Sequence, residues 1–170
     1  MDNKTVERLV KTAIIAALYA VVTIVLAPIS YGAIQFRVSE IMVLLAFFDP
    51  FYIAGLTIGC FIANILGPNG LTDIIFGTIA TFISVCAISF TGRFARNKKA
   101  SLLIASLWPT VFNGLIIGGM LSYLYKLPLA LSIGEVAIGE FVVVTIVGLQ
   151  VVKFIQNKYG KLLLIHKNLK

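Results

Sequence analysis

Polar side chains that can donate or accept hydrogen bonds lie deep inside three of the most apolar segments of the sequence. They are Asn64, Asn113 and Glu140. Glu140 precedes Lys153 by 13 residues, which at the rise of an α-helix places it about 20 Å from that lysine along the axis. The two asparagines lie at about the same height above the preceding polar turn of their own segments. We therefore expect three helices to bring one carboxylate and two amides to a common level.

Three charged residues close to the ends of predicted helices extend this polar level. Arg37 and Glu40 are three residues apart, so they share one face of a helix and we expect them to pair, with Arg37 orienting Glu40. Asp73 follows a threonine at a predicted helix start, where a carboxylate either caps the helix or contacts a ligand. We take all three as candidate binding residues, together with the two asparagines and Glu140.

A second carboxylate and two aromatic rings are further candidates. Glu135 and Glu140 are five residues apart, or about 140° around a helix, so both line one pocket only if its wall is broad. Phe36 and Trp108 are rings that could stack on a planar ligand, although aromatic residues are also common at membrane interfaces. Phe36 is the better candidate, because Trp108 is predicted to lie farther from the polar level.

Charged and amide groups at this depth cost free energy, so they face a cavity or one another. A layer of such groups that opens to one side predicts a pocket for a solute. The predicted outer half of the chain has more carboxylates than cations, which suits a cationic ligand or one rich in N–H donors. Two plainer interpretations stay open: a local pair of Arg37 with Glu40, and asparagines that only join helices.

The composition requires that helices in a membrane position these groups. Of the 170 residues, 59% are hydrophobic and only 12% are charged, about half the charged fraction of a soluble domain. A crossing needs about 20 residues. We predict an all-α, polytopic membrane protein that forms one domain over 1–170. Its six spans are expected at about 9–28, 37–49, 51–66, 72–92, 101–125 and 129–155.

The basic residues predict the orientation of these spans. Twelve of the 14 cations precede the first span, lie in the loop after the fourth, or follow the last. By the positive-inside rule these three regions are cytoplasmic, which puts both termini inside a multi-pass protein of the cell membrane. The same distribution argues against a nucleic-acid-binding patch. The short second span is required, since without it the basic regions would fall on both sides.

Neither an enzyme nor a cofactor-binding protein is indicated. The sequence has no GxxxxGK[ST], HExxH, CxxC or GxSxG motif, and its one histidine, His166, is in the C-terminal tail. We expect no metal site. A pocket without a nucleotide-binding motif indicates a binding subunit that depends on a partner for energy.

Small residues on the first span predict a close helix contact. Ala13, Ala16, Ala17 and Ala20 form overlapping small-xxx-small patterns, which let another helix backbone approach closely. That helix belongs either to the same bundle or to a partner protein.

Several motifs, in order, resemble those of the QueT-type queuosine-precursor transporters. The resemblance covers about residues 10–150, and Glu135 lies outside the part that matches. The matching motifs are 31–40 (YGAIQFRVSE), 59–64 (GCFIAN), 73–78 (DIIFGT), 112–114 (FNG) and Gly139-Glu140.

The resemblance implies the substrate-binding S component of an energy-coupling factor (ECF) transporter, with six helices and a site near the outer surface. Its partners would be a transmembrane T subunit, docked on the alanine stripe, and two ATPase subunits. The implied ligand is a 7-deazaguanine such as 7-aminomethyl-7-deazaguanine, bound by Glu40, Asn64, Asp73, Asn113 and Glu140. Alternatives are an S component for another vitamin or nucleobase, a proton-coupled carrier that uses Glu140, or a purely structural membrane subunit.

Overall fold

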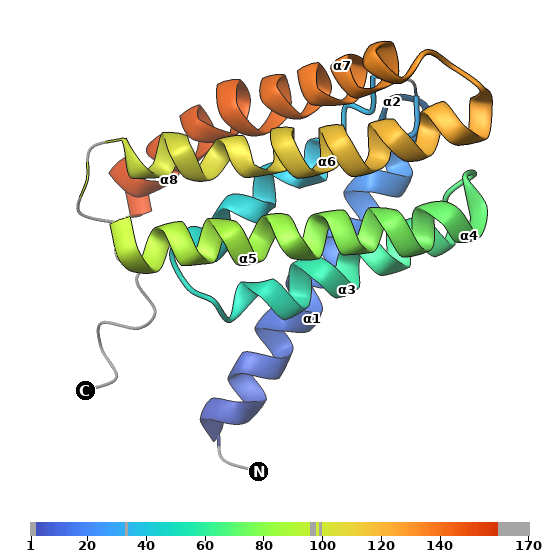
Figure 1. Ribbon diagram of the computed structural model, residues 1–170. Helices are drawn as coiled ribbons and strands as arrows, with labels where there is room; N and C mark the ends of the chain where they lie inside the picture. Colours follow the sequence, from blue (N-terminus) through green and yellow to red (C-terminus); the bar gives the residue numbers. More distant parts are fainter. Residues whose placement is uncertain (1–2, 33, 96–97, 99, 160–170) are drawn as a thin grey trace.

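The computed structural model describes residues 3–32, 34–95, 98 and 100–159, and every regular element in these ranges is a helix (Figure 1). The prediction of an all-helical chain is therefore confirmed for the described residues. The elements in chain order are α1 (Asn3–Val25), α2 (Ala27–Ser30), η1 (Val38–Phe47), α3 (Tyr52–Ile65), α4 (Gly70–Thr72), η2 (Asp73–Gly77), α5 (Thr78–Ala95), α6 (Ser101–Tyr125), α7 (Leu129–Glu140), η3 (Phe141–Gly148) and α8 (Leu149–Tyr159).

Four helical stretches are long and apolar enough to cross a membrane. They are Thr5–Val25, Gly70–Ala95, Ser101–Tyr125 and Leu129–Lys158. Two shorter apolar helices, Val38–Phe47 and Tyr52–Ile65, occupy the positions of the second and third predicted spans. Large apolar side chains are exposed along the outside of these helices, for example Leu18, Phe82 and Leu115. Such a surface suits a lipid environment, as expected for a multi-pass membrane protein.

Helices pack against their neighbours in the sequence and against helices that are farther along the chain. The most extensive contacts join α6 to α7, α1 to α3, and α5 to α6. Figure 1 shows α5, α6 and the α7–α8 rod running lengthwise, while α1 rises from below and passes obliquely behind α3. One end of the bundle holds α2, α4 and the α6–α7 connection, and we call it the far end.

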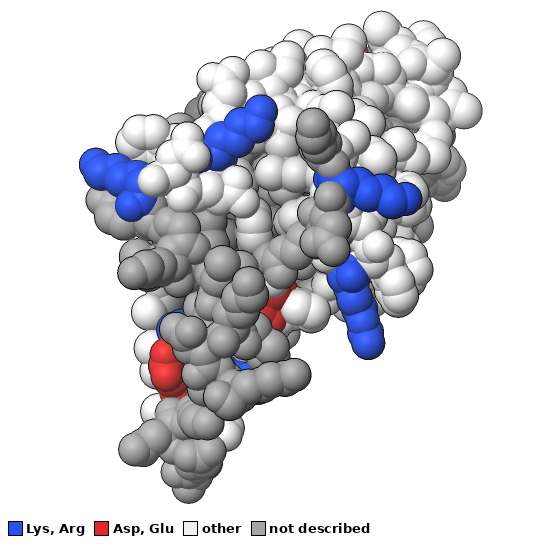
Figure 2. Space-filling model, turned by 90° about the vertical axis from the view of Figure 1, so that its left-hand side faces the viewer, with Lys and Arg blue, Asp and Glu red and all other residues white. Residues whose placement is uncertain are grey.

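The opposite end is basic, and we call it the basic end. Figure 2 shows Lys and Arg side chains spread over this face. The described cations in the segments on this side of the molecule are Arg8, Lys11, Arg93, Lys98, Lys153 and Lys158. The sequence places further basic residues on the same side, but they lie outside the described residues: Arg96, Lys99, Lys161, His166, Lys167 and Lys170.

The second predicted span is a 3₁₀-helix rather than an α-helix. Residues Val38–Phe47 form η1, and at the 3₁₀ rise of about 2.0 Å per residue its ten residues cover about 20 Å. It contacts α1, α3, α5, α6 and η3, so it lies in the middle of the bundle. Glu40 is consequently 0% exposed. A short helix at this central position brings a charged residue into the core.

Two further segments depart from α-helical geometry next to predicted binding residues. The π-helical segment η2 starts at Asp73, and η3 starts directly after Glu140. Single π-helical turns inside α-helices are frequent at functional sites, because the extra residue turns side chains into new directions. Both carboxylates are therefore placed by irregular segments that the apolar pattern does not reveal.

The alanine stripe of α1 is divided between two faces. Ala16 and Ala20 are buried, whereas Ala13 and Ala17 are exposed. The buried face meets α3, where a Cβ atom on Gly59 would lie 2.8 Å from the carbonyl oxygen of Ala16. Half of the stripe thus packs within the bundle. Among the described residues nothing covers the other half, which is free to contact another protein.

Replacing Gly59 with alanine is expected to destabilise the fold by about 1–3 kcal/mol, because the added methyl group would push α1 away from α3. The same Cβ would also lie 2.8 Å from the Cβ of Tyr19. Thermal unfolding in detergent would measure the loss. Gly119→Ala on α6 is the matched control, since no atom lies within 4 Å of its added Cβ. Equal melting temperatures for both variants would contradict this packing.

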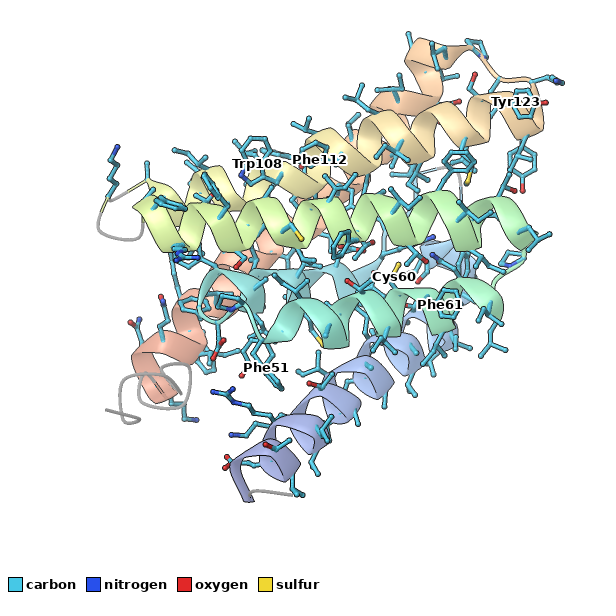
Figure 3. All side chains as sticks on the ribbon, turned by 60° about the horizontal axis from the view of Figure 1, so that its bottom comes forward. Phe51, Cys60, Phe61, Trp108, Phe112 and Tyr123 are labelled. Atoms are coloured by element: carbon cyan, nitrogen blue, oxygen red, sulfur yellow. The ribbon has the colours of Figure 1, made fainter. Side chains whose placement is uncertain are left out.

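The hydrophobic core has two parts. The larger cluster includes Tyr19, Leu44, Leu56, Val85 and Val144, all 0% exposed. The smaller one lies between α5, α6 and α7 and consists of Ala80, Ile117, Met120, Leu121 and Val136. On the outside of α6, the Trp108 and Phe112 rings stack with centroids 5.5 Å apart (Figure 3). Trp108 also donates a hydrogen bond to Thr91 at 2.9 Å, so it has a structural role there.

Candidate functional site

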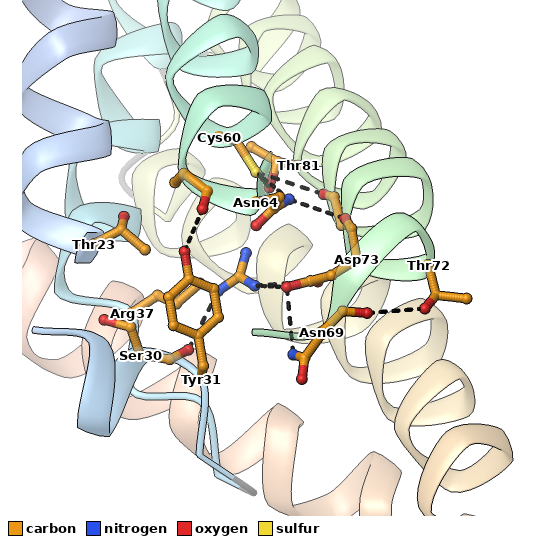
Figure 4. Close-up of polar contacts among 12 residues, drawn as sticks. Thr23, Ser30, Tyr31, Arg37, Cys60, Asn64, Asn69, Thr72, Asp73 and Thr81 are labelled. Atoms are coloured by element: carbon orange, nitrogen blue, oxygen red, sulfur yellow. Dashed lines mark hydrogen bonds and ion pairs between the residues drawn. The ribbon is translucent and has the colours of Figure 1, made fainter. Parts of the chain in front are cut away.

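A buried ion pair joins the residue that precedes η1 to the first residue of η2 (Figure 4). Arg37 Nη2 donates to both Asp73 carboxylate oxygens, at 3.0 and 3.3 Å, and the two side chains are 3% and 0% exposed. Arg37 Nε also donates to the Ser30 carbonyl oxygen at 3.4 Å. The guanidinium forms its ion pair with a carboxylate 36 residues away rather than with Glu40 as expected, and with Glu40 it interacts only electrostatically.

Glu40 is held by hydroxyl groups from two other helices. Tyr19 of α1 and Thr81 of α5 both donate to its Oε1 atom, the latter at 3.2 Å. Its second oxygen, Oε2, is buried and has no hydrogen-bond partner among the described residues. One half of this carboxyl group is therefore fixed, and the other half is available as an acceptor.

Asn64 has the same half-satisfied arrangement. Its Nδ2 donates to the Asp73 carbonyl oxygen at 3.1 Å and to Cys60 Sγ at 3.3 Å (Figure 4). Its Oδ1 is buried without a partner in the described part of the chain. Space for the amide is provided by Gly77, because a Cβ atom there would lie 2.6 Å from Asn64 Nδ2 and 2.8 Å from Asp73 Oδ1.

Glu140 and Asn113 form a third element of the site, between α7 and α6. Asn113 Nδ2 donates to Glu140 Oε1 at 2.6 Å. The Oε2 of Glu140 and the Oδ1 of Asn113 are both buried and have no partner in the described ranges. Glu140 also interacts electrostatically with Glu40 and Arg37. The α6–α7 pair thus faces the groups on η1.

These contacts bring together six of the eight predicted binding residues. Asn64 contacts Asp73, Asp73 pairs with Arg37, and Asn113 contacts Glu140. The Arg37 guanidinium interacts electrostatically with both Glu40 and Glu140. We call the four side chains with a free acceptor oxygen, Glu40, Asn64, Asn113 and Glu140, the acceptor cluster. A buried acceptor without a partner costs about 1–3 kcal/mol. Four such acceptors match a ligand that supplies N–H donors.

The other two predicted binding residues have contacts of a different kind. Phe36 packs against the larger hydrophobic cluster. Glu135 is half-buried and lines a separate cavity of about 320 Å³ at the far end, which we call the end cavity. Its other lining residues are Tyr31, Gly32, Leu121, Tyr125, Leu127 and Ser132. The structure therefore separates Glu135 from Glu140.

Tyr31 forms the wall between the end cavity and the buried ion pair. Its ring lines the cavity and lies over the Arg37 guanidinium, 5.3 Å from CZ to the ring centroid. Its hydroxyl donates to the Ala63 carbonyl oxygen at 2.6 Å. Burial raises the pKa of the Tyr31 phenol, and the neighbouring Arg37 opposes that shift. The ring is thus fastened to α3 while it covers the cation.

Three contributors to the site carry weak signals in the sequence. In the sequence, Tyr19 looks like an ordinary aromatic residue of an apolar helix. Thr81 looks like a residue whose hydroxyl donates to the backbone of its own helix. Gln35 lies in the loop before η1 with φ 50° and is 2% exposed, and its Nε2 has no partner among the described residues. A buried, non-glycine residue in the left-handed region often marks a functional site.

Comparison with known proteins finds a family and a relative that match most of the chain. The family described as "QueT transporter" matches residues 9–157. A curated relative, the "Queuosine precursor transporter QueT" of Lactococcus lactis subsp. cremoris (strain MG1363), is 36% identical over 168 residues, which cover 94% of this chain and 95% of the relative. No solved structure gives a significant match.

Proposed function

Because the chain belongs to the QueT transporter family, we propose that it is the S component of an ECF-type ABC transporter that imports a queuosine precursor. The proposed ligand is a 7-deazaguanine such as 7-aminomethyl-7-deazaguanine. The acceptor cluster is the observation that carries this proposal. The chain then binds and carries a solute rather than transforming it, in keeping with a family of transporters.

The chemistry of the ligand fits the unsatisfied groups. One edge of guanine presents adjacent N–H donors, and the Oε2 atoms of Glu40 and Glu140 are free to accept them. The aminomethyl group adds a cation, which the excess of carboxyl groups over the single guanidinium accommodates. Each hydrogen bond to a charged group contributes about 1.5–3 kcal/mol. The Oδ1 atoms of Asn64 and Asn113 provide two further acceptors.

The proposed orientation places the basic end in the cytoplasm and the far end outside. The two short helices, η1 and α3, complete six crossings with the four long stretches. Both termini are then cytoplasmic in the cell membrane. The acceptor cluster lies toward the outer side, and the end cavity beyond Tyr31 forms the approach to it.

In the proposed ATP-driven mechanism, uptake depends on partners that bind ATP, because the given sequence has no nucleotide-binding motif. We propose a T subunit and two ATPase subunits, with the T subunit docked on the exposed half of the alanine stripe, Ala13 and Ala17. Small side chains there let a partner helix approach the backbone of α1. The buried half, Ala16 and Ala20, is used within the bundle.

Ala17→Trp is expected to abolish co-purification with the T subunit and ATPases while ligand affinity stays within about twofold, since the bulky ring blocks only the docking face. Affinity capture of the assembled transporter and calorimetry on the isolated chain measure the two effects. Phe82→Trp, on the exposed face of α5, is the control and should assemble normally. Full assembly of the Ala17 variant would exclude this face.

Calorimetric titration of the purified chain with 7-aminomethyl-7-deazaguanine tests the ligand. We expect tight binding of deazaguanines and none of thiamine, riboflavin or biotin. A preference for another vitamin or nucleobase would keep the subunit type and change the substrate. Reconstituted vesicles test the mechanism: uptake should need ATP and the partner subunits, whereas uptake driven by a pH gradient without them would identify a proton-coupled carrier.

A further inference from the structure

A large hollow at the basic end is separate from the site described above. It has a volume of about 710 Å³ and lies where η1 ends, α6 begins and α8 passes. Its volume is within the range of ligand-binding cavities. The acceptor cluster contributes no residue to its lining. It therefore requires an explanation of its own.

The short second helix accounts for the hollow. η1 ends at Phe47, and the chain turns at Asp49-Pro50 into α3. α6 and α8 continue past this point toward the basic end (Figure 1). The space between them is bordered by Phe48, Leu102 and Leu149, so its floor is apolar.

The rim of the hollow is basic. Lys98 precedes α6 and Lys153 lies on α8, and both side chains are exposed at the edge of the apolar floor. Gln156, one turn beyond Lys153, adds an amide. None of the described lining residues is acidic. Two ammonium groups above an apolar floor complement a molecule with an anionic head and a hydrocarbon tail.

We propose that this hollow is a binding site for an anionic phospholipid. The phosphate lies between Lys98 and Lys153, and an acyl chain lies along Phe48, Leu102 and Leu149. Basic pockets between membrane helices on the cytoplasmic side bind such headgroups. A free phosphate ion would leave the apolar floor uncovered. The assignment to the inner leaflet depends on the orientation proposed above, whereas lipid binding does not depend on the transported ligand.

Native mass spectrometry of the purified chain, exchanged into detergent with equal amounts of phosphatidylglycerol and phosphatidylcholine, tests the site. We expect the wild type to retain phosphatidylglycerol selectively. The double variant Lys98→Gln/Lys153→Gln should retain at least about tenfold less phosphatidylglycerol than the wild type, because each cation near the headgroup favours the anionic lipid. Lys158→Gln at the same end and Lys126→Gln at the far end lie outside the hollow and serve as controls.

A second measurement separates a lost site from a misfolded chain. Phosphatidylglycerol should raise the melting temperature of the wild type and of both controls, but not of the double variant, whose melting temperature without lipid should match theirs. Equal retention of the two lipids by the wild type would overturn the proposal. So would undiminished retention by the double variant. If that variant kept its lipid but lost assembly with the T subunit and ATPases, the hollow would be a protein-docking surface instead.

Discussion

Glu140→Gln is expected to weaken ligand binding by roughly 10- to 150-fold, which corresponds to the loss of one charge-assisted hydrogen bond of about 1.5–3 kcal/mol. In the wild type, Oε1 of Glu140 is engaged by Asn113, and Oε2 is the atom left to accept from the ligand. In the variant the amide oxygen keeps the bond from Asn113, so an NH₂ group faces the donors of the ligand. Calorimetric titration measures the change in affinity.

Glu135→Gln is the matched control for this prediction. It makes the same chemical change five residues away, in the end cavity. We expect its affinity to stay within about threefold of the wild type, since Glu135 is separated from the acceptor cluster. If Glu135→Gln lost binding and Glu140→Gln kept it, the ligand would occupy the end cavity and the acceptor cluster would be structural.

Arg37→Met is expected to destabilise the fold by about 3–5 kcal/mol, because it leaves the buried Asp73 carboxylate without its cation. Two more carboxyl groups, on Glu40 and Glu140, also interact with the guanidinium, so the loss is shared by the whole site. Thermal unfolding in detergent measures it. The double variant Arg37→Met/Asp73→Leu should recover part of the loss, since it removes both members of the ion pair.

Lys126→Met is the control for the arginine. Lys126 is an exposed cation at the far end, where its ammonium lies 4.7 Å from the Tyr123 ring centroid. Losing an exposed cation–π contact costs about 0.5–1 kcal/mol. If Arg37→Met unfolded at the same temperature as this control, the buried ion pair would contribute nothing to the fold.

The sequence predicts the members of the site better than their contacts. Asn64, Asn113 and Glu140 stand out because a polar residue inside an apolar span is costly without a partner. The structure brings them together with Arg37 and Asp73. Their binding roles remain predictions that the titrations above test.

The contacts were unpredictable for specific reasons. The local rule that pairs residues three apart assumes that both lie within one helix, but Arg37 is the extended residue that precedes η1. This arginine meets Asp73, a partner set by the packing of distant segments. Tyr19 completes the Glu40 contacts from α1, and nothing in the local pattern separates it from an ordinary membrane aromatic.

The helical class follows from composition, whereas finer features follow from packing. The apolar content and the spacing of turns predict helices close to those observed, including Ser101–Tyr125. The π-helical segments next to Asp73 and Glu140 leave no trace in hydropathy. The alanine stripe is visible in the sequence, but its division into a buried and an exposed face depends on where α3 lies.

The most direct test of the acceptor cluster is mass spectrometry of the small molecule that stays with the protein after gentle purification. Wild-type protein and Glu140→Gln should be prepared in parallel from the same cells. We predict a 7-deazaguanine at close to one molecule per chain in the wild type, and its depletion in the variant. A different molecule, or equal amounts of the same one in both preparations, would contradict the account.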